Sequence, residues 1–149
     1  MRALIQRVSS ANVTIDGKRY SHIEQGLVIF LGIKTSDTEP DGKYLAEKCA
    51  ALRIFEDSEE KMNLSLKNVN GSVLVVSQFT LYGDSRKGNR PSFVDAAPPL
   101  IAEPLYDKFV EHLRNLLGSE KVSTGVFRAM MDVALVNDGP VTVIVESKN

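Results

Sequence analysis

Hydrophobic residues in the first third of the chain are grouped in short runs that predict β-strands. Residues 3–8 are apolar enough to form a strand. Residues 13–15 are followed directly by Asp16-Gly17, which favours the positive φ angles of a tight hairpin turn. Residues 26–33 form a continuous apolar run of strand length. A run of that kind is typical of a strand that is buried on both faces.

Two later segments have the spacing of amphipathic helices. The first is predicted to begin near Ser36 or Asp37, with Pro40 in its first turn and with Leu45, Cys49 and Leu52 on one face. The second is predicted over residues 103–117, where four apolar side chains recur at helical spacing before Gly118.

The remaining apolar segments, at residues 73–76, 133–136 and 141–145, predict further strands. The residues between the last two segments, Asn137-Asp138-Gly139-Pro140, are interpreted most simply as a hairpin loop. Many strands with two well-spaced helices predict an α+β fold that forms a single domain over residues 1–149. We expect a curved or barrel-like, mainly antiparallel sheet with two main helices packed on it.

Composition and charge narrow the class of protein further. The chain has 149 residues with a formal net charge of −1, which excludes a strongly basic nucleic-acid coat and leaves only a local patch for RNA. Cys49 is the single cysteine, so the chain has no internal disulfide and no zinc site built on two or more thiolates. No apolar run is long enough to span a membrane, and the first residues do not resemble a signal peptide. We therefore expect a cytoplasmic protein.

The first candidate catalytic residues are Ser77-Gln78-Phe79-Thr80, which follow the apolar strand predicted at 73–76. Backbone N–H groups that lose their sheet partners at such a point can stabilise an oxyanion. If the strand continued, alternation would place Gln78 and Thr80 on one face and Ser77 and Phe79 on the other. The alternative is a strand that simply runs into a loop. Thr80 could act as a nucleophile only with a neighbouring base, and no histidine is nearby in the sequence.

The loop from Gly83 to Arg90 has the glycine spacing of a phosphate-binding loop. Asn89 stands where that motif needs lysine, and Pro91 disfavours the helix that should follow. Two alternatives are a solvated loop and a surface for RNA phosphates at the mouth of a pocket. The second would use the following side chains: Arg86, Lys87, Arg90 and Phe93.

Several strings of this sequence resemble D-aminoacyl-tRNA deacylases across nearly the whole chain. The principal ones are Ser77-Gln78-Phe79-Thr80-Leu81 and Asn137-Asp138-Gly139-Pro140-Val141-Thr142, supported by Arg90-Pro91-Ser92-Phe93 and by segments at 3–8 and 61–64. The resemblance implies a homodimeric hydrolase that needs no metal and no organic cofactor. It would remove D-amino acids, and also glycine, that are wrongly esterified to tRNA.

The resemblance also assigns roles to individual residues. Ser77, Gln78, Phe79 and Thr80 would line the pocket for the terminal adenosine and its amino acid, with backbone N–H groups as oxyanion donors. Gly139-Pro140 would be a cis dipeptide that reaches into the active site of the other subunit and excludes L-amino acids there. Asn137 belongs to the same motif, and Arg7 would support this loop.

Two other functions stay open at this point. One is a non-catalytic RNA-binding domain with the same fold. The other is a nucleotide hydrolase built on residues 83–88. The sequence does not reveal the preferred tRNA or amino acid, the extent of glycine editing, or whether the loop from Arg86 to Arg90 contacts the acceptor stem.

Overall fold

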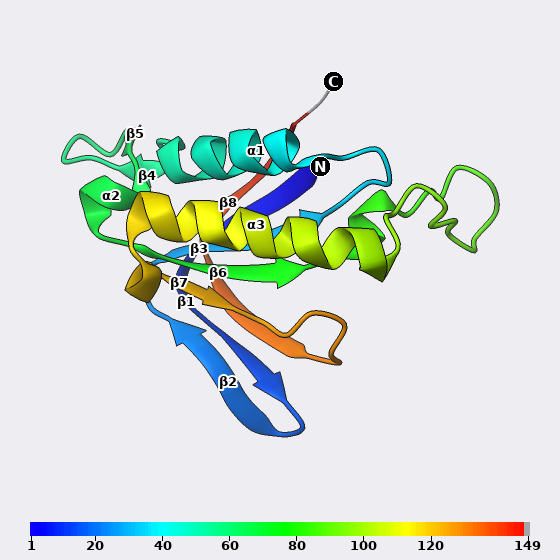
Figure 1. The fold of residues 1–149 in the computed structure, drawn as a ribbon. Helices are drawn as coiled ribbons and strands as arrows, with labels where there is room; N and C mark the ends of the chain where they lie inside the picture. The colour runs from blue at the N-terminus through cyan, green and yellow to red at the C-terminus, as the bar shows by residue number, and fades with distance from the viewer. Residues whose placement is uncertain (148–149) are drawn as a thin grey trace.

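A curved six-stranded sheet forms the frame of the protein in the computed structural model, which describes residues 1–147 (Figure 1). The long strand β1 is its centre and pairs antiparallel with β2, β3 and β8. The parallel half follows, with β6 beside β3 and β7 beside β6. The bounds of these strands are β1 Arg2–Ile15, β2 Lys18–Ile23, β3 Gly26–Gly32, β6 Ser72–Ser77, β7 Val122–Thr124 and β8 Asp132–Glu146.

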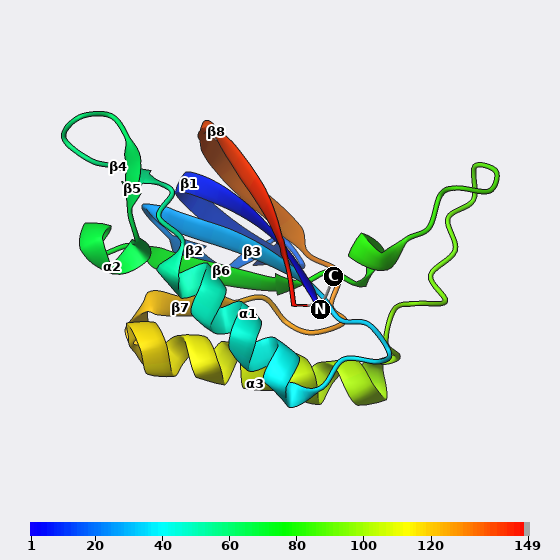
Figure 2. The same ribbon diagram turned by 90° about the horizontal axis from the view of Figure 1, so that it is seen from above.

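Two helices, α1 (Glu39–Ala51) and α3 (Pro99–Leu117), lie side by side across one face of this sheet (Figure 2). Their buried side chains, such as Leu45 and Phe109, pack on Ile5 and Leu27 of the strands in the main core. A second core cluster is formed by side chains of β1, β2, β3 and β6, namely Val8, Ala11, Val13, Ile23, Val28, Leu74 and Val76. The predicted α+β class, with a barrel-like sheet and two main helices, is therefore confirmed.

A small substructure that was not predicted from the sequence forms a sheet of its own, separate from the six-stranded sheet. It contains a two-stranded ribbon and one helical turn, namely β4 Phe55–Glu56, β5 Met62–Leu64 and α2 Leu66–Val69. Among residues 1–147, no helix has both the length and the apolar character needed to cross a membrane.

Both helices begin at positions other than those predicted. Helix α1 is capped by Thr38, whose backbone N–H donates to the Asp41 side chain at 2.8 Å, whereas Asp37 accepts a hydrogen bond from the terminal amine of Met1. Helix α3 begins at Pro99 and contains Pro104 in its interior. Pro99 is suited to the first turn, where a missing N–H costs nothing, so the helix starts earlier than its apolar stripe.

The hairpin predicted at Asp16-Gly17 is confirmed, with φ angles of 51° and 75° at the two residues. The second hairpin, at residues 137–140, is wrong. Residues 132–146 form one strand, β8, that follows β1 along most of its length. Gln6 of β1 pairs with Thr142 of β8, and the next paired residue of β1, Val8, pairs with Asn137. Residues 138–141 therefore form a bulge opposite the single residue Arg7.

Candidate active site

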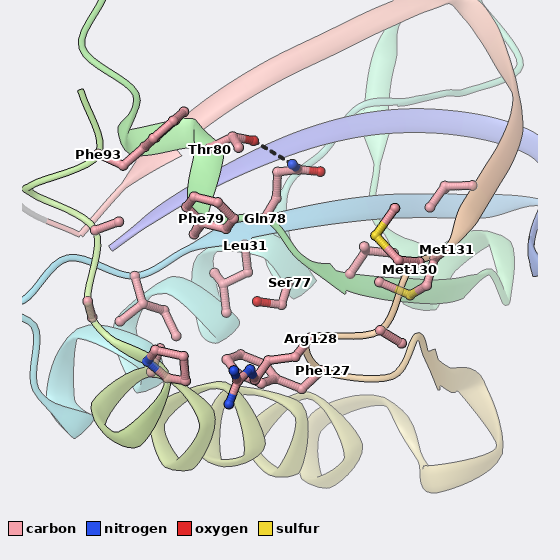
Figure 3. Close-up of a pocket in the computed structure, with 18 residues that line it drawn as sticks. Leu31, Ser77, Gln78, Phe79, Thr80, Phe93, Phe127, Arg128, Met130 and Met131 are labelled. Carbon is pink, nitrogen blue, oxygen red and sulfur yellow. Dashed lines mark hydrogen bonds between the residues drawn. The ribbon is translucent and has the colours of Figure 1, made fainter. Parts of the chain in front are cut away.

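A pocket of about 790 Å³ opens where β3 and β6 end, beside the first turns of α3 and the loop that precedes β8 (Figure 3). Five residues singled out from the sequence line it together, namely Ser77, Gln78, Phe79, Thr80 and Phe93. All four residues of the predicted catalytic motif therefore meet at this pocket.

The polar motif lines this pocket because β6 ends at the first residue of the motif and the chain then turns. Strand β6 stops at Ser77, and the Gln78 N–H donates to the carbonyl of Leu31 at 2.8 Å. A 3₁₀ turn, η1 (Phe79–Tyr82), follows at once, and its first bond joins the Leu81 N–H to the Gln78 carbonyl at 3.2 Å. The strand therefore ends where the sequence becomes polar, and the alternation considered for residues 77–80 does not apply, because a 3₁₀ turn follows.

The end of β6 leaves two backbone donors available at the pocket. The N–H groups of Phe79 and Thr80 precede the first bond of η1 and have no hydrogen-bond acceptor among the described residues. Two adjacent donors of this kind are suited to an oxygen that becomes negatively charged during a reaction.

The side chains of the pocket offer little acid–base chemistry. Gln78 donates from its amide to the Thr80 hydroxyl, so these two side chains engage each other (Figure 3). Within the described part of the chain, the lining contains no histidine, carboxylate or lysine, and Arg128 is its one charged residue. The hydroxyl of Thr80 therefore has no base beside it.

Two aromatic rings stand at the mouth of the pocket. Phe79 and Phe93 meet edge to face with their centroids 5.2 Å apart, and each keeps more than a third of its surface exposed. Exposed rings at a pocket mouth offer a stacking surface for a flat heterocycle such as a nucleobase.

The loop between η1 and α3 contains the other basic residues singled out from the sequence. Arg86 forms a salt bridge with Asp84 at 2.7 Å, and hydrogen bonds from Arg86 hold the Asp84 pKa at about 2. Lys87 and Arg90 are exposed. After Gly88 no helix begins before Pro99 in the described structure, so the phosphate-loop interpretation lacks the helix that it requires.

Arg7 and Gly139 form a second assembly, at the bulge of β8. The Arg7 side chain is buried and donates to the carbonyls of Ile54 at 2.8 Å and Asp138 at 3.1 Å. Its guanidinium lies 3.4 Å from the carboxylate of Asp138 and 3.7 Å from that of Glu56. Arg7 thereby ties the bulge to β1 and to the chain segment that leads into β4.

The bulge has the geometry that the resemblance implied. The Gly139-Pro140 bond is cis, and Gly139 has a φ of 133°. The Asn137 side chain accepts from the Val141 N–H and donates to the Thr142 hydroxyl, both at 3.1 Å. Gly139 and Pro140 are exposed, and neither lines the pocket of the described chain.

Residues 127–131, which were not predicted from the sequence to belong to the site, form another wall of the pocket. Arg128 stands out there because its φ is 68°, a left-handed conformation that is uncommon for a residue with a side chain. The only sequence signal was an arginine between apolar residues just before the last strand.

The remaining candidate for nucleophilic chemistry is remote from this site. Cys49 lies on the buried face of α1, and burial raises the pKa of its thiol to about 12. Among the described residues, no group of three or more histidine, cysteine or acidic side chains is arranged to hold a metal ion.

Comparisons with known proteins relate the whole chain to one family. The family model described as D-Tyr-tRNA(Tyr) deacylase matches residues 4–146. The D-aminoacyl-tRNA deacylase of Desulfatibacillum aliphaticivorans is 60% identical over 148 residues, which cover 99% of this chain and 100% of the relative. The enzyme of the same name from Thermotoga petrophila is 56% identical, with 99% and 97% covered.

Solved structures agree with this assignment of the fold. A protein named c-Myc DNA Unwinding Element Binding Protein superposes with a TM-score of 0.95 at 40% identity, with both chains fully covered. A probable eukaryotic D-amino acid tRNA deacylase shares the fold, with a TM-score of 0.84 at 17% identity and 97% and 98% covered. The match of the family model and the close relatives establish that this chain belongs to the D-Tyr-tRNA(Tyr) deacylase family.

Proposed function

We propose that this protein is a D-aminoacyl-tRNA deacylase, a hydrolase that cleaves the ester between a D-amino acid and the terminal adenosine of tRNA. The observation that carries this proposal is the pair of available N–H groups at Phe79 and Thr80 in the pocket. Its relatives have this activity in their names, and the reaction on tRNA would take place in the cytoplasm.

The chemistry suits a pocket without an acid–base pair. An aminoacyl ester is an activated ester, so its hydrolysis needs a positioned water and stabilisation of the oxyanion more than a strong base. The two N–H groups would hold the carbonyl oxygen as it becomes charged. The neighbouring ribose hydroxyl of the substrate would assist, and the rings of Phe79 and Phe93 would contact the adenine. No cofactor is required.

Selection against L-amino acids would depend on Gly139-Pro140 of a second copy of the chain. The dipeptide is exposed and does not line its own pocket. It lies on β8, an edge strand whose outer side exposes Val136 and Ile144. An exposed edge strand with apolar side chains favours association with another chain. In a symmetric dimer this surface would bring each bulge to the pocket of the partner subunit.

Backbone atoms are well suited to this selection, because they exclude a side chain by its handedness and not by its identity. Carbonyl oxygens of the bulge would accept hydrogen bonds from the substrate ammonium group and would occupy the space that an L side chain needs. Glycine, which has no side chain, would enter as well. Arg7 would keep the bulge in place through its bonds to Asp138 and Ile54.

Hydrolysis of D-Tyr-tRNA and L-Tyr-tRNA by the purified protein tests the activity. We expect cleavage of the D-ester alone, and an enzyme that leaves both esters intact would contradict the proposal. Phe79→Pro and Phe79→Ala form a matched pair, since both remove the ring but only proline removes the N–H. Proline is tolerated in a first turn, so we expect an additional loss in kcat of about 10²- to 10³-fold in Phe79→Pro.

The bulge is tested separately by an insertion of one glycine after Pro140. Arg7 can no longer hold the longer bulge in its original position. We therefore expect the variant to cleave L-Tyr-tRNA as well as the D-ester. An insertion variant that folds and still spares the L-ester would show that selection lies elsewhere.

Nucleic-acid binding without catalysis is the competing function, because one structural neighbour is named as a DNA-binding protein. The same assay separates the two, since a binding module would retain tRNA and leave the D-ester intact.

A further inference from the structure

Arg128 has no role in the reaction described above, although its side chain lines the same pocket. It lies on the wall next to α3, across the pocket from Gln78 and Thr80 (Figure 3). It is exposed, and no hydrogen bond or ion pair of its guanidinium is present within residues 1–147. A free cation therefore stands at the rim of a pocket whose lining is otherwise uncharged.

The backbone at Arg128 argues against a purely structural role. A φ of 68° costs a residue with a side chain about 1 kcal/mol relative to glycine. Within residues 1–147 the side chain makes no hydrogen bond, ion pair or ring contact that would offset this cost. Strained residues of this kind gather at sites that bind ligands.

We propose that Arg128 binds the phosphodiester on the 5′ side of the terminal adenosine of the substrate. This inference rests on the proposed function. If the adenosine and its amino acid occupy the pocket, the polynucleotide leaves through the mouth, and the first charge outside is this phosphate. A guanidinium matches a phosphate through two parallel N–H···O bonds. Arg128 would thus position the substrate without taking part in ester cleavage.

The position of the charge also distinguishes Arg128 from the other basic residues near the mouth. Arg86 is paired with Asp84, and Lys87 and Arg90 lie outside the pocket lining. Arg128 is the single cation that combines contact with the pocket and freedom from a protein partner among the described residues.

The test compares two substrates, D-Tyr-tRNA and the D-tyrosyl ester of adenosine, which has no phosphate. For Arg128→Gln we expect kcat/KM on D-Tyr-tRNA to fall about 5- to 10-fold at low salt through KM, with kcat retained. Activity on the adenosine ester should stay within about twofold. Arg128→Lys should keep most of the affinity, because it keeps the charge. Arg19→Gln, which removes an exposed arginine on β2 that does not line the pocket, is the matched control.

A second measurement is independent of catalysis. Binding of uncharged tRNA should become less dependent on salt in Arg128→Gln, with the slope of log K against log salt reduced by about 0.7 for one phosphate on a single strand. Arg128→Gly should lose the same affinity yet melt about 2–4 °C higher, because glycine relieves the left-handed backbone.

Equal losses on both substrates, or no loss on D-Tyr-tRNA, would overturn the role of Arg128 in phosphate binding. A loss confined to substrates with an acidic D-amino acid would assign the guanidinium to the amino acid and overturn it as well. If the unmodified protein hydrolyses neither ester, the deacylase function itself fails, and the role proposed for Arg128 fails with it.

Discussion

Replacement of Arg7 by alanine should affect both stability and selectivity, because one buried side chain holds the bulge of β8. The change removes the hydrogen bonds to the Ile54 and Asp138 carbonyls and leaves both acceptors without this donor. Hydrogen bonds from a charged donor contribute about 1.5–3 kcal/mol each. The ion pairs with Glu56 and Asp138 add little, because both carboxylates are half-exposed to solvent.

We therefore expect Arg7→Ala to lower the free energy of unfolding by about 3–5 kcal/mol, a large part of the roughly 5–15 kcal/mol of a typical domain. Arg7→Lys keeps the charge but cannot reach both carbonyls, so a loss of about 1–2 kcal/mol is expected. Urea unfolding measures both changes as a shift of the midpoint at constant m-value.

The same variants should discriminate less well between D- and L-Tyr-tRNA. A loosened bulge no longer holds its carbonyl oxygens in place, and displacement by about 1 Å can cost about 100-fold. We expect the ratio of kcat/KM for the two esters to fall at least about 10-fold in folded Arg7→Lys. Arg53→Ala is the control: it removes an exposed arginine that has no hydrogen bond or ion pair within residues 1–147, and it should stay within about 0.5 kcal/mol of the parent. Equal stability of Arg7→Ala and Arg53→Ala, or unchanged selectivity in Arg7→Lys, would refute the reasoning.

Three further predictions concern single side chains. Thr80→Ala should keep deacylation within about 10-fold, because Thr80 has no base to activate it; a loss of several orders of magnitude, with an acyl-enzyme trapped in the parent, would restore it as the nucleophile. Cys49 should resist alkylation in the folded protein near pH 8 and react at an ordinary rate in urea, since burial raises its pKa to about 12; fast labelling of the native state would contradict its burial. Burial also raises the pKa of half-buried Tyr82 to about 12, above the unfolded value of about 10. Its contribution to stability is full below about pH 10 and is lost as pH rises toward 12, so Tyr82→Phe should flatten the alkaline decline in urea midpoints.

The strands of the core were predictable from the sequence, because a buried strand requires a run of apolar residues and such a run is visible in the sequence. The unbroken apolar run of β3 and the Asp16-Gly17 turn both correspond to the observed elements. The two helices were predicted from their apolar stripes, although proline and capping residues, rather than the stripes, decide where they begin. The spacing of apolar residues indicates which face of a helix or strand is buried, but it does not fix the residue at which the element begins or ends.

The features of the site that were missed depend on contacts between distant residues. Asp138-Gly139-Pro140 signals a turn locally, but Arg7, 131 positions earlier than Asp138, holds the segment as a bulge within one long strand. The polar end of β6 is equally compatible with a strand and with a 3₁₀ turn. The wall at Arg128 joins the pocket only because the loop before β8 folds beside α3. Local sequence does not contain this information.

The central claim is that the pocket of one subunit and the bulge of its partner form each site together. It is tested most directly by adding an excess of Phe79→Pro chains, with their intact bulge, to the variant with one glycine inserted after Pro140. Subunits are allowed to exchange, and hydrolysis of D- and L-Tyr-tRNA is followed. In a mixed dimer the one intact pocket faces an intact bulge. The account predicts that L-Tyr-tRNA hydrolysis falls as mixed dimers form, while D-Tyr-tRNA hydrolysis persists. A ratio of the two rates that stays constant, whatever the excess of Phe79→Pro, would contradict it.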